Sequence, residues 1–225
     1  ETISAVGTTY MTGMGEKVTQ HFATTIELRL AQVDSLVGSI PPDSASPSSL
    51  RAELARNAKA RDFAALAFYS PTGAFDMIYG DEPVLADPDS FLASMNNGDK
   101  KVAVASIATG QKDVLLGVSA AYLMADGTTS TALVASLPAD YIADTLSLYS
   151  ENSLVYSHII RRDGSFVIRS GDAFRENYFD RIQALFEEQG ESGEQYIREL
   201  EAAMDKGEDY SALMVFGSER RHLQC

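Results

Sequence analysis

The first forty residues constrain the fold most strongly, because apolar residues recur there with the period of one long α-helix. Spacings of three, four and seven dominate from Ile3 to Ile40, and the first proline is Pro41. A helix of roughly 38 residues is roughly 57 Å long, which exceeds the width of a compact domain of this size. We therefore expect the helix to project, to span two modules or to pair with a second copy of itself.

The middle of the chain has the texture of an antiparallel sheet. A loop rich in helix breakers, 41–49, leads into a second helix that ends near Arg61, and turn residues then separate a series of strand-like runs. A short helix ending at Gly98 is expected between the second and third runs. The five runs are 62–70, 73–80, 101–108, 113–124 and 130–138.

The last third repeats this order in a shorter form. A helix over 139–150 is followed by a hairpin that turns at Asp163-Gly164, then by two helical stretches, and then by strands over 210–225. The order of hairpin, helices and strands matches that of the preceding segment. We expect a second, smaller and incomplete module.

Three stretches resemble the double Cache sensors of bacteria, which are tandem PAS-like modules outside the membrane. "GVSAAYLMADGTTSTALVASLPADYI" (117–142) resembles the family's fourth strand, turn, fifth strand and following helix. "YSHIIRRDGSFVIRSGD" (156–172) is similar to the hairpin that opens the membrane-proximal module, and "MGEKVTQHFATTIELRLAQVDSLV" (14–37) is similar to the signalling helix. The resemblance implies an α+β fold with a long N-terminal helix and two PAS-like antiparallel modules, divided as 1–61, 62–150 and 151–225.

The resemblance also implies a function. We expect the extracytoplasmic ligand-sensing domain of a bacterial membrane receptor, anchored by flanking spans outside this sequence and forming a homodimer through the N-terminal helix. The output domain would be a histidine kinase, a cyclic-dinucleotide enzyme or a chemoreceptor. The absence of tryptophan, and of arginine between Arg61 and Arg161, argues against the amino acid ligands that are common in the family. A secreted solute-binding protein without signalling output is the alternative.

Composition excludes several other functions. Eighteen basic and 32 acidic residues give a formal net charge of -14, which repels nucleic acid. The single cysteine, Cys225, allows no internal disulfide and no thiol cluster for zinc. No run of about 18 apolar residues is present, and the N-terminus does not have the pattern of a signal peptide. The chain begins without methionine, so we expect a segment of a longer protein.

Catalytic and metal-binding patterns are weak. Gly117-Val118-Ser119 approaches the nucleophile elbow of a serine esterase, but strand-forming residues continue past Ser119, whereas the elbow needs a sharp strand-to-helix turn. The three histidines lack the spacing of metal ligands. We therefore expect no enzyme activity, no metal and no cofactor in this segment, with a serine esterase as the least favoured alternative.

A small-molecule pocket is the remaining candidate site. Alternation along the strands places Gly117 and Ser119 on one face, and Val134 and Ser136 on one face of the next strand. We expect these small residues to leave room for a ligand, with Lys101 able to neutralise a carboxylate. The face of Tyr122 is ambiguous, because regular alternation puts it opposite Ser119. The candidate ligand-binding residues are Tyr69, Tyr79, Lys101, Ser119, Tyr122 and Ser136.

Overall fold

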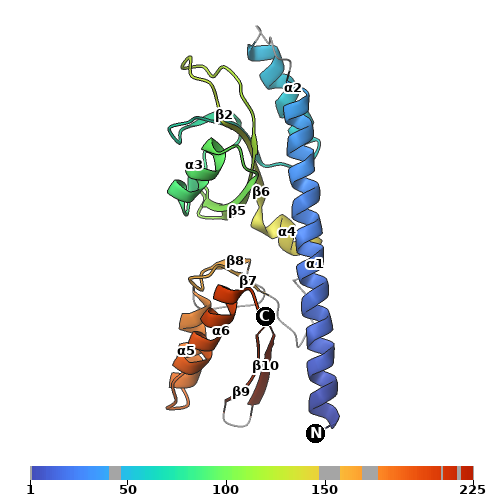
Figure 1. Cartoon of the computed structure of the whole chain (residues 1–225), viewed down its shortest axis with the longest axis vertical. Coiled ribbons are helices and arrows are strands. Elements are labelled where there is room, and N and C mark those ends of the chain that lie inside the picture. Colours follow the sequence, from blue (N-terminus) through green and yellow to red (C-terminus); the bar gives the residue numbers. More distant parts are fainter. Residues whose placement is uncertain are drawn as a thin grey trace. The chain divides into compact units, whose positions relative to one another are not determined.

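The computed structural model describes residues 2–40, 47–146, 158–168, 177–208, 210–216 and 219–224. The chain divides into two compact units. One consists of Ala23–Ile142, and the other of Glu1–Phe22 together with Ala143–Cys225. Each unit is described by itself below (Figure 1).

Helix α1 (Thr2–Gly38) confirms the predicted long N-terminal helix. Its residues in the Ala23–Ile142 unit bury one face. Ile26, Val33 and Leu36 are all buried there, at the seven- and three-residue spacings that put side chains on one side of a helix. The opposite face of this part of α1 is exposed.

The Ala23–Ile142 unit contains one six-stranded antiparallel sheet of order β2-β1-β6-β5-β4-β3. Its strands match the predicted runs but are shorter, and β3 was not predicted. The six strands, and the two helices that lie in sequence between α1 and the last strand, are α2 (Pro47–Lys59), β1 (Ala65–Tyr69), β2 (Phe75–Tyr79), β3 (Val84–Leu85), α3 (Pro88–Asn96), β4 (Lys101–Ser106), β5 (Lys112–Ser119) and β6 (Ala132–Pro138).

Helices cover both faces of this sheet. Figure 1 shows α3 on one side and α1 with α2 on the other. Proline in the first turn of α3 and the Asp87 carboxylate, which accepts a hydrogen bond from the Ser90 amide, fix the start of α3. Its buried side chains, Phe91 and Met95, then face the sheet. The sheet is therefore enclosed between two helical layers.

The other unit contains shorter elements. Helix α4 (Ala139–Thr145) crosses the division between the units at Ile142. Two small antiparallel sheets follow, one of β7 (Ile159–Ile160) with β8 (Phe166–Ile168), the other of β9 (Ser211–Phe216) with β10 (Glu219–Gln224). Between them lie α5 (Tyr178–Glu187) and α6 (Glu194–Lys206). These elements confirm the predicted order of hairpin, helices and strands.

The turn between β7 and β8 is fixed by local hydrogen bonds. The Ser165 hydroxyl and amide both donate to Asp163 Oδ1, and these bonds hold the pKa of Asp163 below its usual value. Gly164 has a φ of +79°, and a Cβ there would lie 2.6 Å from Asn177 Oδ1. Because Asn177 caps α5, the hairpin packs against the start of that helix.

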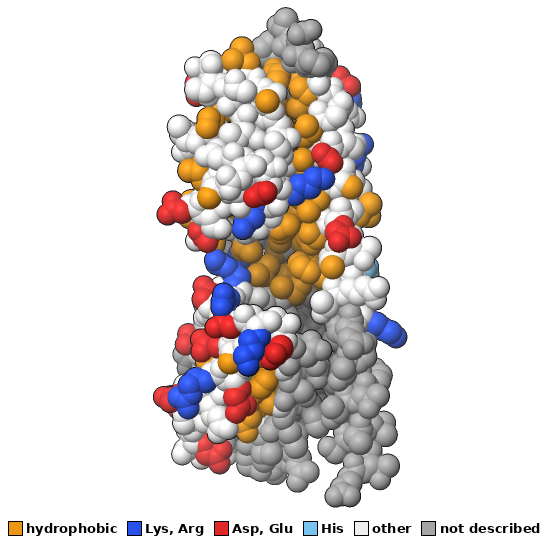
Figure 2. Space-filling model, viewed as in Figure 1, with side chains coloured by type: hydrophobic (Ala, Val, Ile, Leu, Met, Phe, Trp, Pro, Cys, Tyr) orange, Lys and Arg blue, Asp and Glu red, His pale blue; other side chains and the backbone are white. Residues whose placement is uncertain are grey.

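Several predictions fall partly outside the described residues. They are the breaker-rich loop at 41–46, the end of the helix over 139–150, and residues 156–157 and 169–172 of the stretch that resembles the opening hairpin. Over the described residues, no helix is both long and apolar enough to cross a membrane. Figure 2 shows acidic and basic side chains intermixed over α5 and α6, so this surface has no continuous basic stripe.

Candidate ligand-binding site

The sheet face under α3 is built mainly from small residues. Cross-strand partners point to the same face of a sheet, and the pairing of β1, β4, β5 and β6 brings the alternate residues of each strand together there. Most of these residues are alanine, glycine or serine. They are Ala65, Ala67, Tyr69, Lys101, Ala103, Ala105, Asp113, Leu115, Gly117, Ser119, Ala132, Val134 and Ser136.

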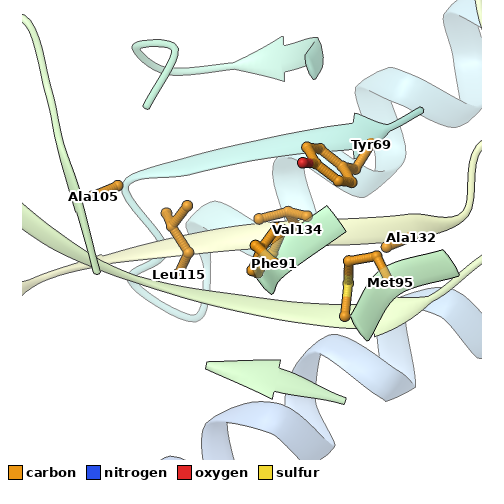
Figure 3. Close-up of a cluster of buried hydrophobic side chains, with 7 residues drawn as sticks. All are labelled: Tyr69, Phe91, Met95, Ala105, Leu115, Ala132 and Val134. Carbon is orange, nitrogen blue, oxygen red and sulfur yellow. The ribbon is translucent and has the colours of Figure 1, made fainter. Parts of the chain in front are cut away.

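Side chains of α3 fill the space that these small residues leave. Phe91 and Met95 form a buried cluster with Tyr69, Leu115 and Val134 (Figure 3). A Cβ added to Gly117 would lie 2.6 Å from Met95 Sδ. In this structure the small residues accommodate the close packing of α3, and a ligand pocket on this face stays a prediction.

Four of the six predicted site residues lie on this face. Tyr69 is buried against the rings of Phe75 and Phe91, and burial raises its pKa above the usual value. Lys101 Nζ lies 3.3 Å from Ser90 Oγ at the start of α3. Ser119 is exposed at the end of β5, and Ser136 is buried on β6.

The structure places Tyr79 away from this group. The β1–β2 pairing shifts register between Leu66 and Ala67, and Tyr79 pairs with Leu66, so it points to the face covered by α1 and α2. Its hydroxyl donates to the Phe63 carbonyl at 2.8 Å, and the Lys59 ammonium lies 4.8 Å from its ring centroid. Burial raises the pKa of Tyr79 to about 12. These contacts fit a structural residue.

Tyr122 also lies away from this group. Strand β5 ends at Ser119, three residues before Tyr122, and the Tyr122 ring stacks on Phe68 with 4.5 Å between centroids. Phe68 alternates with Tyr69 and so belongs to the face covered by α1 and α2. The Tyr122 hydroxyl is buried with no hydrogen-bond partner among the described residues.

Sequence reasoning missed Asp113, a buried carboxylate on the face under α3. Asp113 is 2% exposed, and the Ser136 hydroxyl donates a hydrogen bond to its Oδ2. A buried carboxylate is costly unless it is paired and hydrogen-bonded, and within the described part of the chain no cation forms a salt bridge with it. An aspartate at the start of the run "DVLLGV", directly before its apolar residues, was the signal available in the sequence.

The local structure around Ser119 differs from that of a hydrolase. Residues 120–131 after β5 form an irregular loop with an isolated bridge between Leu123 and Thr129. A nucleophile elbow instead requires a helix immediately after the serine. The described chain at Ser119 therefore lacks the backbone geometry that the esterase interpretation needs.

Solved structures with the same fold are sensor domains of bacterial receptors. The chain aligns over 95% of its length with the ligand-binding domain of the amino acid chemoreceptor PctB of Pseudomonas aeruginosa PAO1 in complex with L-Gln, at 13% identity and a TM-score of 0.59, covering 81% of that chain. It also aligns over 96% of its length with a domain of a putative sensory box/GGDEF family protein from Vibrio parahaemolyticus, at 10% identity and a TM-score of 0.56, covering 94% of that chain.

A third similar structure is the extracellular domain of the putative histidine kinase vpHK1S-Z8. The alignment covers 96% of this chain and 89% of that one, at 8% identity and a TM-score of 0.56. No family model matches the chain, and no curated protein matches its sequence. These likenesses confirm, at the level of the fold, the predicted resemblance to double Cache sensor domains.

Proposed function

We propose that this chain is the extracytoplasmic ligand-sensing domain of a bacterial membrane receptor. The shared fold supports this function, since the similar structures are ligand-binding or extracellular domains of chemoreceptors and of a histidine kinase. The observation that carries the proposal is Asp113, a buried carboxylate hydrogen-bonded to Ser136 on the sheet face under α3. An unpaired buried charge is costly for stability alone and suits a site that receives a cation.

The proposed ligand is a small molecule that carries an amine. Its ammonium group would pair with Asp113, and Lys101 on the same face would meet an anionic group. Two similar chemoreceptor domains were solved with GABA and with L-valine, and both of these molecules combine an amine with a carboxylate. The missing tryptophan and arginine argued against an amino acid ligand. Asp113 and Lys101 can instead supply a negative and a positive charge for such a ligand from other positions. Tyr69 completes the proposed site, whereas Ser119 lies at the opposite end of β5 from Asp113.

Ligand entry at this face requires α3 to move. Phe91 and Met95 fill the space over Gly117, so a bound ligand must displace them. A ligand that binds only the displaced arrangement shifts the population toward it. The proposed signal is this displacement of α3, passed through the sheet to α1 on its other face.

The proposed receptor is a homodimer anchored by flanking membrane spans, with a cytoplasmic kinase or cyclic-dinucleotide output. Helix α1 offers a surface for pairing, because Thr24, Leu28, Ala31 and Ser35 recur at spacings of four, three and four and are all exposed. This is the spacing of residues that meet in a parallel coiled coil. Leu28 is the large apolar side chain of this surface and is 59% exposed.

A thermal-shift screen of amines, amino acids and organic acids tests the ligand proposal. A binder at one hundred times its dissociation constant adds about 2.7 kcal/mol to the free energy of unfolding. We expect amine-bearing binders to stabilise the wild-type chain and Asp99→Asn, a control at an exposed aspartate, but not Asp113→Asn. A binder that stabilises Asp113→Asn equally would refute the assigned role of Asp113. A complete screen without any binder would refute the sensing function.

A further inference from the structure

Arg29 is a buried arginine on the face of α1 that packs against the Ala23–Ile142 unit. It is 8% exposed. Its Nη1 donates to the Arg61 carbonyl at 2.7 Å and to Gln32 Oε1 at 2.9 Å. The guanidinium also lies 4.7 Å from the centroid of the Tyr141 ring on α4 and 5.8 Å from that of Phe63. One side chain of α1 therefore contacts α4 and the segment that joins α2 to β1.

The Arg61 carbonyl belongs to the turn that ends α2. Asp62 adopts a left-handed conformation with a φ of 60°, and the Asp62 and Phe63 amides donate back to Lys59 and Ala58, as in a Schellman motif. The carbonyls at a helix end lack partners within the helix and attract a cation. Arg29 supplies that cation from a different helix.

This contact is unusual because the guanidinium is buried without an ion pair. Burial lowers the pKa of Arg29, and the nearby charge of Asp62 opposes that shift. No carboxylate in the described part of the chain forms a salt bridge with Arg29. An apolar side chain of similar volume often packs at such a place at least as favourably. The guanidinium instead provides hydrogen bonds and ring contacts to several elements at once.

The connections between the two units pass through the same helices. The chain passes from one unit to the other twice, inside α1 between Phe22 and Ala23 and inside α4 between Ile142 and Ala143. Arg29 lies on α1 and its aromatic partner Tyr141 lies on α4. Both chain connections are therefore linked, within the Ala23–Ile142 unit, by one side-chain contact.

We infer that Arg29 is a coupling residue that makes α1 and α4 move together, so that a rearrangement of the sheet reaches the other unit through both connections. As a route for a signal, this inference rests on the proposed sensing function. The coupling itself is a property of the ligand-free chain and can be measured without a ligand. Arg29 acts by positioning the two helices and does not contact the ligand.

Hydrogen–deuterium exchange on the complete 225-residue chain tests the coupling. Arg29→Met removes the guanidinium from α1, and Tyr141→Leu removes the ring from α4. We expect Arg29→Met to accelerate exchange in α4, and Tyr141→Leu to accelerate exchange around residue 29 of α1, each by about tenfold or more. Arg29→Lys, which retains a charge but not the planar stacking group, should give a smaller effect in α4.

Leu36→Ala is the matched control, because Leu36 is a buried α1 residue about two turns from Arg29. This variant should lower protection throughout the Ala23–Ile142 unit, with no preference for α4. The inference is refuted if Arg29→Met leaves exchange in α4 unchanged, or accelerates all amides of the unit as Leu36→Ala does. If Arg29→Met does not fold, Arg29→Lys and Tyr141→Leu decide the question.

The same measurements separate this inference from the proposed function. Cross-helix acceleration without any binder in the thermal-shift screen would support the coupling and refute ligand sensing. A binder without cross-helix acceleration would support sensing and refute the role of Arg29.

Discussion

The packing of α3 on the sheet can be tested with a double-mutant cycle of Met95→Ala and Gly117→Ala. A methyl group on residue 117 would lie 2.6 Å from Met95 Sδ and 3.0 Å from Phe91 Cζ, so both side chains must shift. Overpacking of a core costs about 1–3 kcal/mol, and replacing glycine in a strand regains about 0.5–1 kcal/mol. We expect Gly117→Ala to lower the free energy of unfolding by about 1–2 kcal/mol.

The second arm of the cycle removes the opposing side chain. Met95 is 1% exposed, and truncation of such a buried residue to alanine costs about 2–5 kcal/mol. In the double variant, the new methyl group enters space that Met95 has vacated. The double variant should therefore be more stable than the sum of the single effects predicts, by about 1 kcal/mol or more.

Urea unfolding followed by circular dichroism measures all four proteins of the cycle. Gly38→Ala is a control for glycine replacement without a steric conflict, because an added Cβ there meets nothing within 4 Å. Additivity within about 0.5 kcal/mol would show that Met95 and Gly117 are not in contact. The face under α3 would then be open to a ligand without movement of the helix, and the reasoning about displacement would fail.

Two further predictions concern other parts of the chain. The folded-state pKa of Tyr79 is raised from 10.0 to about 12, so the stability that the neutral hydroxyl contributes is complete below pH 10 and is lost as the pH rises toward 12. Urea unfolding across a pH series should therefore show the free energy of unfolding of the wild-type chain falling between pH 10 and about pH 12. Tyr79→Phe should reduce this fall and should cost about 1 kcal/mol at lower pH for the lost hydrogen bond. In a Cys225→Ser background, Leu28→Cys should form an intermolecular disulfide under mild oxidation, and non-reducing gels measure its rate. Ala23→Cys, an exposed control on another side of α1, should form the disulfide more slowly. Equal rates would contradict pairing of two chains through the α1 surface that contains Leu28.

Local periodicity was sufficient to predict most of the elements. The 3.6-residue period of α1, and the strand-forming runs of β1, β4 and β6 between turn residues, depend on neighbouring residues alone. The turn at Asp163-Gly164 was predictable for the same reason, since glycine tolerates the positive φ that the turn requires. The fold class therefore followed from the sequence.

The membership of the site was less predictable, because it depends on which face each strand residue occupies. The register shift between Leu66 and Ala67 reverses the face of Tyr79. Strand β5 ends at Ser119 because the Ser130 hydroxyl binds the backbone groups that follow. This hydroxyl donates to the Ala120 carbonyl and accepts from the Tyr122 amide. Both effects arise from contacts distant in sequence, which alternation within one strand cannot reveal.

The position of α3 also sets a limit on the affinity of the proposed ligand. Exposing two fully buried side chains of the size of Phe91 and Met95 costs about 3–6 kcal/mol, which weakens the apparent affinity by a factor of about 10² to 10⁴. The site is therefore expected to bind weakly unless the charge pair with Asp113 recovers part of this cost. Truncating Met95 removes part of the displacement cost, so Met95→Ala should bind the same ligand more tightly while unfolding more easily. If α3 closes the site, Met95→Ala should raise the affinity and lower the stability. If the pocket were preformed, the loss of Met95 would lower both the affinity and the stability.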